Sequence, residues 1–200
     1  MTDDTTPDTS DDLAARRGVE TEVYQPAEDS QLLAEQAVAE VGSDHCVLEV
    51  GTGSGFVAQR VAEESGARVV ASDLNPHACR QARERGIEAV RADLVTPFRD
   101  DAFDVVLFNP PYLPEDAAAA REDWMEVALT GGETGREVID PFLDAVGRVL
   151  APDGFVLLLV STLTGVDEVV ERAADNGFSA AALADESFPF ETLTILKLVR

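Results

Sequence analysis

The chain has 200 residues, with 39 acidic and 15 basic side chains, a net charge of −24, and 45% hydrophobic residues. This apolar content supports a buried core and excludes an intrinsically disordered chain, and one domain is the simplest expectation for the length. A surface this acidic repels phosphate backbones at ordinary salt, which disfavours a nucleic-acid-binding protein unless concentrated salt screens the charges.

The basic residues are almost all arginine: fourteen of the fifteen are Arg, and the other is Lys197. An acid excess with almost no lysine is typical of proteins from extreme halophiles, and we interpret the composition in that way. The alternative is an acidic protein from a GC-rich genome.

Cysteine and histidine usage favours a cytoplasmic protein without a metal site. Cys46 and Cys79 cannot form a disulfide framework, and His45 and His77 have no spaced partners for metal binding. The acidic start of the chain lacks the apolar segment of a signal peptide, and the longest apolar run, residues 155–160, is too short to span a bilayer. No membrane partner is therefore expected.

The chain then alternates between helix and strand patterns. Residues 1–13 are acidic and are predicted to be disordered, and residues 14–200 are predicted to form a single domain. Helices are predicted at 28–41, 56–64, 76–85, 137–150 and 167–176, and strands at 46–50, 68–72, 88–91, 103–108, 154–160, 178–183 and 191–199.

This alternation predicts an α/β fold in which a parallel sheet is covered by helices on both faces. The last two strands have no helix between them, so they must pair antiparallel as a hairpin. Right-handed crossovers then give a doubly wound sheet, whose ligand crevice lies at the carboxyl ends of the strands.

Polar residues or glycines follow four successive strands of this predicted sheet. They are Glu49 with Gly51-Thr52-Gly53-Ser54-Gly55, then Asp73, then Asp93, and then Asn109-Pro110-Pro111-Tyr112. Each has an ordinary structural alternative: a tight glycine turn, a helix cap, a solvated acid and a proline turn. Because all four occur at the edge where this fold binds ligands, we interpret them together as a binding site.

A nicotinamide-dependent enzyme is the natural competing interpretation. Such enzymes carry GxGxxG, whereas this chain has GxGxG followed by the bulky Phe56, and no downstream catalytic His or Tyr-Lys pair is apparent. Asp73 follows Gly55 by eighteen residues, near the spacing at which an acid meets ribose hydroxyls. The Asn-Pro-Pro-Tyr sequence at the fourth strand end is a catalytic signature that decides against a dehydrogenase.

These motifs resemble those of the class I S-adenosylmethionine-dependent methyltransferases. Within that class, residues 24–30, 47–55, 109–112 and 131–140 are similar to the HemK-type glutamine methyltransferases, in their short archaeal and eukaryotic form. The resemblance extends over nearly the whole chain from Val23 onward. It implies a Rossmann-like sheet of seven strands in the order 3-2-1-4-5-7-6, with the last strand antiparallel.

The resemblance also implies how S-adenosylmethionine would bind. Gly51, Thr52, Gly53 and Gly55 would pass under its methionine part with Glu49 nearby, Asp73 and Leu74 would meet the ribose, Asp93 and Leu94 would hold the adenine, and Asn109 would lie at the methyl group. Pro26, Glu28 and Ser30 resemble a loop that closes over the cofactor, and the alternative is a plain turn before a helix.

Asn-Pro-Pro-Tyr marks the methyltransferases that act on planar amide or amino nitrogens. We expect the Asn109 side-chain oxygen and the Pro110 carbonyl to accept the two N–H groups of a substrate amide. Pro110 and Pro111 would stiffen the turn, and Tyr112 would stack on the flat amide.

The substrate and the partner follow from the resemblance alone. The expected substrate is the glutamine of a Gly-Gly-Gln motif in a peptide chain release factor, methylated at N5. The alternatives are an exocyclic amino group of nucleic acid, either adenine N6 or a tRNA guanine, a protein lysine, or a non-catalytic cofactor-binding subunit. The short form works with a small zinc-binding activator, which would add along the third strand at Ile87, Ala89 and Val90 unless these residues pack on helices.

The acid excess itself generates a prediction about solvent. We expect the melting temperature to fall when salt is lowered from molar to dilute concentration, because self-repulsion of the acidic surface is then no longer screened. A melting temperature that is the same in both would remove the halophile interpretation.

Overall fold

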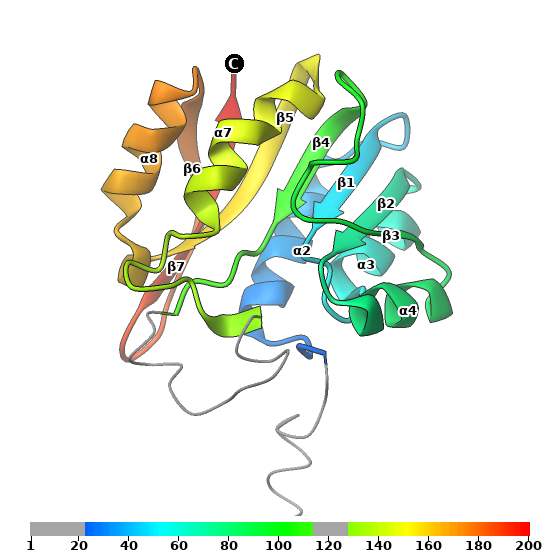
Figure 1. Ribbon diagram of the computed structural model, residues 1–200, viewed down its shortest axis with the longest axis horizontal. Helices are drawn as coiled ribbons and strands as arrows, with labels where there is room; N and C mark the ends of the chain where they lie inside the picture. The colour runs from blue at the N-terminus through cyan, green and yellow to red at the C-terminus, as the bar shows by residue number, and fades with distance from the viewer. Residues whose placement is uncertain (1–22, 114–127) are drawn as a thin grey trace, which may run out of the picture.

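The computed structural model describes residues 23–113 and 128–200, in which seven strands form one sheet of order β3-β2-β1-β4-β5-β7-β6 (Figure 1). The strands are β1 (Cys46–Val50), β2 (Arg68–Asp73), β3 (Glu88–Arg91), β4 (Phe103–Phe108), β5 (Leu150–Ser161), β6 (Ser179–Ser187) and β7 (Thr192–Val199). From β3 to β5 all neighbours are parallel, and β7 is antiparallel to both β5 and β6. The predicted strand order and the antiparallel last strand are confirmed.

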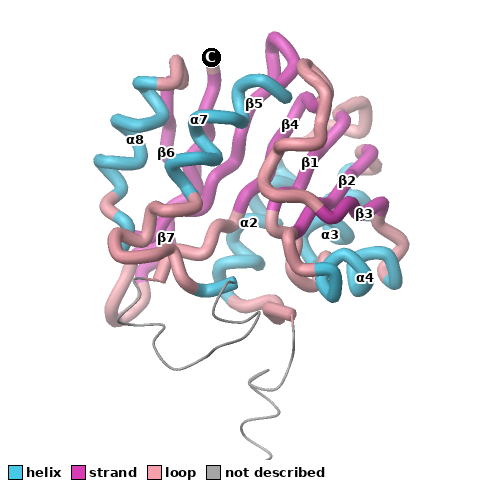
Figure 2. Tube along the Cα trace, viewed as in Figure 1, coloured by secondary structure: helices cyan, strands magenta, loops and turns pink. Residues whose placement is uncertain are grey.

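Helices cover both faces of the sheet, as the alternation predicts (Figure 2). The helices are α2 (Glu28–Glu40), α3 (Phe56–Ser65), α4 (Pro76–Glu84), α7 (Ile139–Val149) and α8 (Val166–Asp175), with a short 3₁₀ turn, η1 (Thr162–Thr164), after β5. Alternate residues of each strand face opposite sides. One core therefore joins Val105 to α2, α3 and α4, and the other joins Val106 to α7 and α8.

Helix α2 is fixed against the sheet by apolar packing and by an ion pair. Leu33, Ala34 and Ala37 are fully buried in the first core. At the end of the helix, Glu40 accepts a 2.6 Å hydrogen bond from the ammonium group of Lys197 on β7. The same ammonium lies 4.3 Å from the centre of the Phe155 ring. These contacts hold the helix and so determine where its first residues lie.

Two strands are longer than predicted, and in each case a register shift is the reason. β5 begins at Leu150, which pairs with Phe103 before the register shifts and Phe155 pairs with Val105. β6 continues to Ser187 past a shift between Ala182 and Ala184. Such irregularities insert residues that break the alternation of buried and exposed side chains, so the sequence pattern ends early.

The edge strand β3 is correctly predicted, but two of the three residues expected along its exposed edge are buried. Ile87 and Ala89 are only 8% and 9% exposed and belong to the core with Ala82 of α4. The expectation that Ile87 and Ala89 lie on an exposed edge is therefore wrong, because α4 covers this side of the strand. Val90 points the other way and is 38% exposed.

Among the described residues, no helix is both long enough and apolar enough to cross a membrane.

Candidate active site

A cavity of about 240 Å³ lies where the parallel strands end, toward the lower edge of the sheet in Figure 1. It is lined by nearly all the residues that the sequence analysis singled out: Ser30, Glu49, Gly51, Thr52, Gly53, Asp73, Leu74, Asp93, Leu94, Asn109, Pro110, Pro111 and Tyr112. The fold thus brings together side chains that are separated by up to 82 positions in the sequence.

The glycine loop after β1 has the conformation that a close backbone approach requires. Gly51 and Gly53 have φ angles of +64° and +53°, which side chains rarely adopt. A Cβ on Gly51 would lie 3.4 Å from the Phe108 ring, and a Cβ on Gly53 would lie 3.4 Å from the Tyr24 carbonyl oxygen. These distances are ordinary van der Waals contacts, so it is the positive φ angles that favour glycine at both positions.

Gly55 has a different task from its neighbours. It is not among the residues that line the cavity, and a Cβ there would lie 2.9 Å from Cα of Ala82 on α4. Its φ of +80° also starts α3 sharply. The third glycine of the motif therefore permits close packing of the loop on α4, where the sequence analysis expected a contact under the cofactor.

Asp73 is held at the end of β2 with its carboxylate oriented by backbone groups. Its Oδ2 accepts a 2.9 Å bond from the Gly53 N–H, and its Oδ1 accepts a 2.8 Å bond from the Asn75 N–H. Burial raises the pKa of Asp73, while these backbone donors oppose the rise. The Leu74 N–H is a third backbone donor to this carboxylate, and since a carboxylate can accept about four hydrogen bonds, it can still accept one from a ligand hydroxyl.

Glu49 is 4% exposed and bonds to the loop itself. Its Oε2 accepts from the Thr52 hydroxyl and, at 3.1 Å, from the Ala58 N–H in the first turn of α3. Burial raises the pKa of Glu49 to about 8, against the smaller lowering effect of these donors. Although it borders the cavity, Glu49 thus ties the glycine loop to α3.

After β3, Asp93 and Leu94 form one wall of the cavity. Asp93 is exposed, whereas Leu94 is half-buried and packs against the second core. Leu94 has a φ of +49°, an uncommon conformation for a residue with a side chain and one that occurs preferentially at functional sites.

The Asn-Pro-Pro-Tyr sequence follows β4 directly. Asn109 Nδ2 donates to Asp29 Oδ2 at 3.0 Å, whereas Asn109 Oδ1 is buried and has no hydrogen-bond partner among the described residues. Pro110 is buried, and burial is the main cause that raises the pKa of Tyr112, so its hydroxyl stays neutral. The arrangement leaves one amide oxygen without a partner beside a stiff turn that carries no backbone N–H at 110 or 111.

Asp29 is a site residue that the sequence analysis missed. It borders the cavity and is 4% exposed. The neighbouring Glu28, which the resemblance suggests as a cofactor contact, is exposed and does not line the cavity, and neither does Pro26. The helical pattern contains the missing signal: Asp29 precedes the buried Leu32 and Leu33 by three and four positions, so it shares their face of α2.

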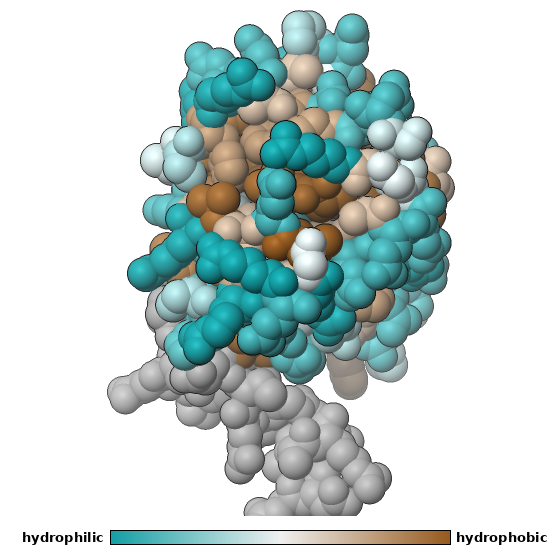
Figure 3. Space-filling view, turned by 90° about the vertical axis from the view of Figure 1, so that its right-hand side faces the viewer, coloured by the Kyte–Doolittle hydropathy of each residue, from teal (hydrophilic) through white to brown (hydrophobic). Residues whose placement is uncertain are grey.

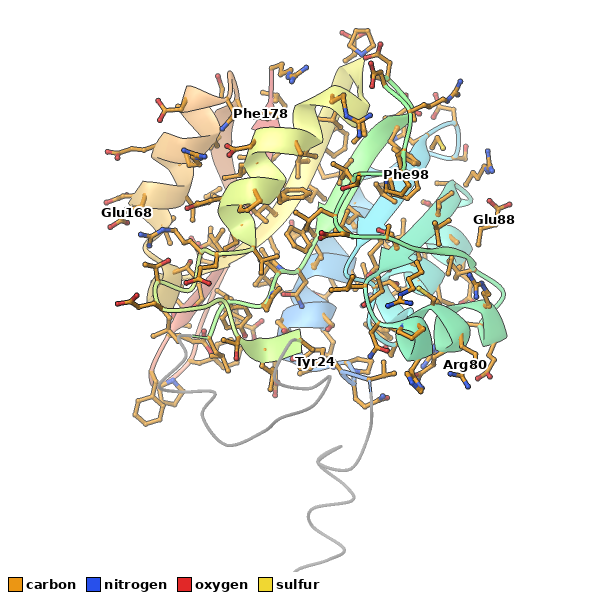
Figure 4. The ribbon with its side chains drawn as sticks, viewed as in Figure 1. Tyr24, Arg80, Glu88, Phe98, Glu168 and Phe178 are labelled. Carbon is orange, nitrogen blue, oxygen red and sulfur yellow. The ribbon has the colours of Figure 1, made fainter. Side chains whose placement is uncertain are left out.

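The residues of the cavity fit S-adenosylmethionine. Asp73 offers carboxylate oxygens to a ribose diol, the glycine loop allows close backbone approach, and Leu74, Leu94 and Phe108 supply apolar walls for an adenine ring. Within residues 23–113 and 128–200, no three His, Cys, Asp or Glu side chains are grouped so that they could hold a metal ion. Figure 4 places Tyr24 beside the start of α2, at the same end of the sheet as the cavity that it lines.

We expect Glu49 to make the free energy of unfolding fall as pH rises from about 5 to about 8. The unfolded chain ionises this carboxyl near its ordinary pKa of 4.5, whereas the folded protein keeps the proton until about pH 8. The stabilisation is therefore complete below 4.5 and is lost through 8, at about 1.4 kcal/mol per pH unit between these values.

Urea unfolding at fixed salt measures this effect against Glu49→Gln, which is neutral at every pH and keeps both hydrogen-bond donors satisfied. The wild type should lose stability relative to the variant across the range. Parallel pH curves would mean that Glu49 is already ionised in the folded protein.

Comparison with known proteins gives the family. A methyltransferase domain family matches residues 47–132. The chain is 35% identical to a putative protein N5-glutamine methyltransferase of Methanocaldococcus jannaschii, over 90% of this chain and 92% of that one, and 32% identical to human methyltransferase HEMK2, over 92% of each. A solved structure of the E. cuniculi Mtq2–Trm112 complex, described as responsible for methylation of the eRF1 translation termination factor, matches with a TM-score of 0.76 and 33% identity, over 90% of this chain and 99% of that chain. The chain therefore belongs to the HemK-type family of class I methyltransferases, which use S-adenosylmethionine.

Proposed function

We propose that this protein transfers a methyl group from S-adenosylmethionine to the side-chain amide nitrogen N5 of the glutamine in the Gly-Gly-Gln motif of a peptide chain release factor. The observation that carries the proposal is the buried Asn109 Oδ1, which lacks a hydrogen-bond partner although the other end of the same amide is bonded. A buried acceptor without a donor is costly in a folded protein and calls for an N–H group from a ligand.

A primary amide supplies such donors. Its nitrogen carries two N–H groups in one plane, and the Asn109 side-chain oxygen and the Pro110 carbonyl would accept one each. Neither Pro110 nor Pro111 has a backbone N–H that could compete for these acceptors. Tyr112, whose ring is half-buried at the rim, would lie on the flat face of the amide.

The chemical problem is that an amide nitrogen is a poor nucleophile, because its lone pair is delocalised into the carbonyl. Two acceptors on its N–H groups draw electron density toward the nitrogen and fix it in one orientation, so positioning supplies most of the rate. When bound, S-adenosylmethionine supplies a methyl group on a cationic sulfur. A C–N bond forms as the C–S bond breaks, the electron pair of that bond stays on sulfur, and the nitrogen loses its extra proton to water.

The relatives support this substrate. The M. jannaschii protein is named a putative protein N5-glutamine methyltransferase, and the E. cuniculi complex is described as responsible for methylation of a translation termination factor. The human relative is named methyltransferase HEMK2. Each match covers 90% or more of this chain. A tRNA adenine-N6 methyltransferase of Aeromonas hydrophila is 32% identical over 70% of this chain, so nucleic acid is the alternative that an experiment must separate.

We expect radiolabelled S-adenosylmethionine to label purified release factor and not its Gln→Ala variant, in concentrated salt. Asn109→Ala should lower the rate by about 100-fold or more, because it removes an acceptor that acts on the reacting nitrogen. Calorimetry should show that the same variant still binds S-adenosylhomocysteine.

Parallel reactions with tRNA and DNA complete the design. Label found only in nucleic acid, or label that persists in the Gln→Ala release factor, would overturn the proposed substrate. An Asn109→Ala enzyme with a near-wild-type rate would overturn the proposed mechanism.

We further infer that a small zinc-binding activator of the Trm112 type pairs along β3. β3 is an edge of the sheet, and an edge strand is a template for strand addition, although here the Ala89 carbonyl already accepts from the Arg83 guanidinium. Val90 on this strand is apolar and 38% exposed. Figure 3, which faces this side of the molecule, shows apolar surface near the centre of the face with hydrophilic residues around it, and Glu88 of β3 lies at the outer edge in Figure 4.

Val90→Glu should abolish co-purification with such a partner, because it places a charge in the centre of the contact. Val199→Glu is the matched control: Val199 is 40% exposed, but it lies on β7, away from the β3 edge of the sheet. Equal recovery of the partner with both variants, or a fully active and soluble protein expressed alone, would contradict this interface.

We also propose that the protein works in concentrated salt, as expected for a haloarchaeal origin. The support is the net charge of −24. Few of the acids that produce this charge line the cavity. A neutral amide substrate needs no such surface. The comparison of melting temperatures in molar and dilute salt tests this proposal independently of the reaction.

A further inference from the structure

Asp29 is a buried acid of the cavity wall that contacts Asn109 but that the reaction as described does not use. It lies in the first turn of α2 and is 4% exposed. Its Oδ2 accepts from Asn109 Nδ2 at 3.0 Å and from the Tyr24 hydroxyl at 3.0 Å. Its Oδ1 accepts from the Ser30 N–H at 2.6 Å and from Ser30 Oγ at 3.2 Å. The carboxylate therefore has four donors, and no basic side chain among the described residues pairs with it.

These four bonds decide what Asp29 can do. Each carboxylate oxygen has two lone pairs, and all four are occupied. No lone pair remains to accept a proton from a substrate nitrogen, so Asp29 is not placed as a general base. The Tyr24 hydroxyl is a neutral donor, because burial and then the Asp29 charge raise the pKa of Tyr24.

The bond to Asn109 fixes which end of that amide is free. A carboxylate only accepts hydrogen bonds, so it must face the Nδ2 end of Asn109, and a flipped amide would set oxygen against oxygen. Asn109 Oδ1 is thereby left as the unpartnered acceptor of the cavity wall. Without Asp29, nothing among the described contacts of Asn109 distinguishes the two orientations.

We propose that Asp29 is a positioning residue that holds Asn109 with its amide oxygen toward the substrate amide and strengthens that oxygen as an acceptor. The proposal rests on the function proposed above. A hydrogen bond to a carboxylate is charge-assisted, and chains of hydrogen bonds polarise one another, so negative charge shifts onto Asn109 Oδ1. This acceptor matters most when the substrate nitrogen gains positive charge during methyl transfer, so the effect falls on kcat.

Asp29→Asn removes the charge with almost no change in shape. The new amide can donate to Asn109, which would then turn its own Nδ2 toward the substrate. We expect kcat for release factor to fall by about tenfold or more, while KM and the affinity for S-adenosylhomocysteine change by less than about threefold. Glu35→Gln removes one charge from an exposed position of the same helix and should leave all three values unchanged.

A swapped pair keeps the test decisive if Asp29→Asn folds poorly. Asn109→Asp alone would place two carboxylates side by side, and its rate should fall by about 100-fold or more. Asp29→Asn combined with Asn109→Asp restores a donor and an acceptor between the two positions, with the free acceptor still at 109. We expect this double variant to recover at least about tenfold of the rate lost by Asn109→Asp.

The outcomes separate the two proposals. Suppose that wild-type enzyme labels release factor. The role of Asp29 alone would then be overturned if the kcat of Asp29→Asn lies within about twofold of wild type, or if the swapped pair is no faster than Asn109→Asp. No label in release factor with wild-type enzyme would overturn the proposed function, and the role of Asp29 with it.

Discussion

The hydrogen bond between Asp29 and Asn109 joins two parts of the fold that are 80 residues apart in the sequence. It links the first turn of α2 to the residue that follows β4, at the edge where the parallel strands end. The helix can make this bond because Leu33 and Ala37 are buried against the sheet and because Glu40 is paired with Lys197. The position of the amide oxygen therefore depends on the docking of the whole helix.

The acids of this very acidic chain divide into two physical kinds. Most of those in the described residues lie at the surface, where charges of the same sign repel one another. Glu49, Asp73 and Asp29 are in the cavity wall, and each is held by hydrogen-bond donors and not by a basic side chain. Burial raises the pKa of Glu49 to about 8 and also raises that of Asp73. A buried carboxyl with donors can fix a loop or an amide in place, which a solvated one cannot do.

The sequence pattern predicts the sheet and the polar residues that all four strand ends bring to the cavity, because alternation and the chirality of crossovers leave few other topologies. It does not identify Asp29 over Glu28, because the choice depends on how α2 is rotated against the sheet. It also misplaces Ile87, since the side of β3 that α4 covers is set by packing. The role of Gly55 required the position of Ala82, and the extra length of β5 required its register shift.

The central claim is that Asp29 acts on the reaction through Asn109, and a double-mutant cycle on kcat tests it most directly. Asp29→Ala, Asn109→Ala and the double variant would be compared with wild type on release factor at saturating S-adenosylmethionine. Two residues that act as one unit are strongly non-additive, so Asp29→Ala should cost less than about twofold once Asn109 is already Ala. Full additivity of the two losses would contradict the account.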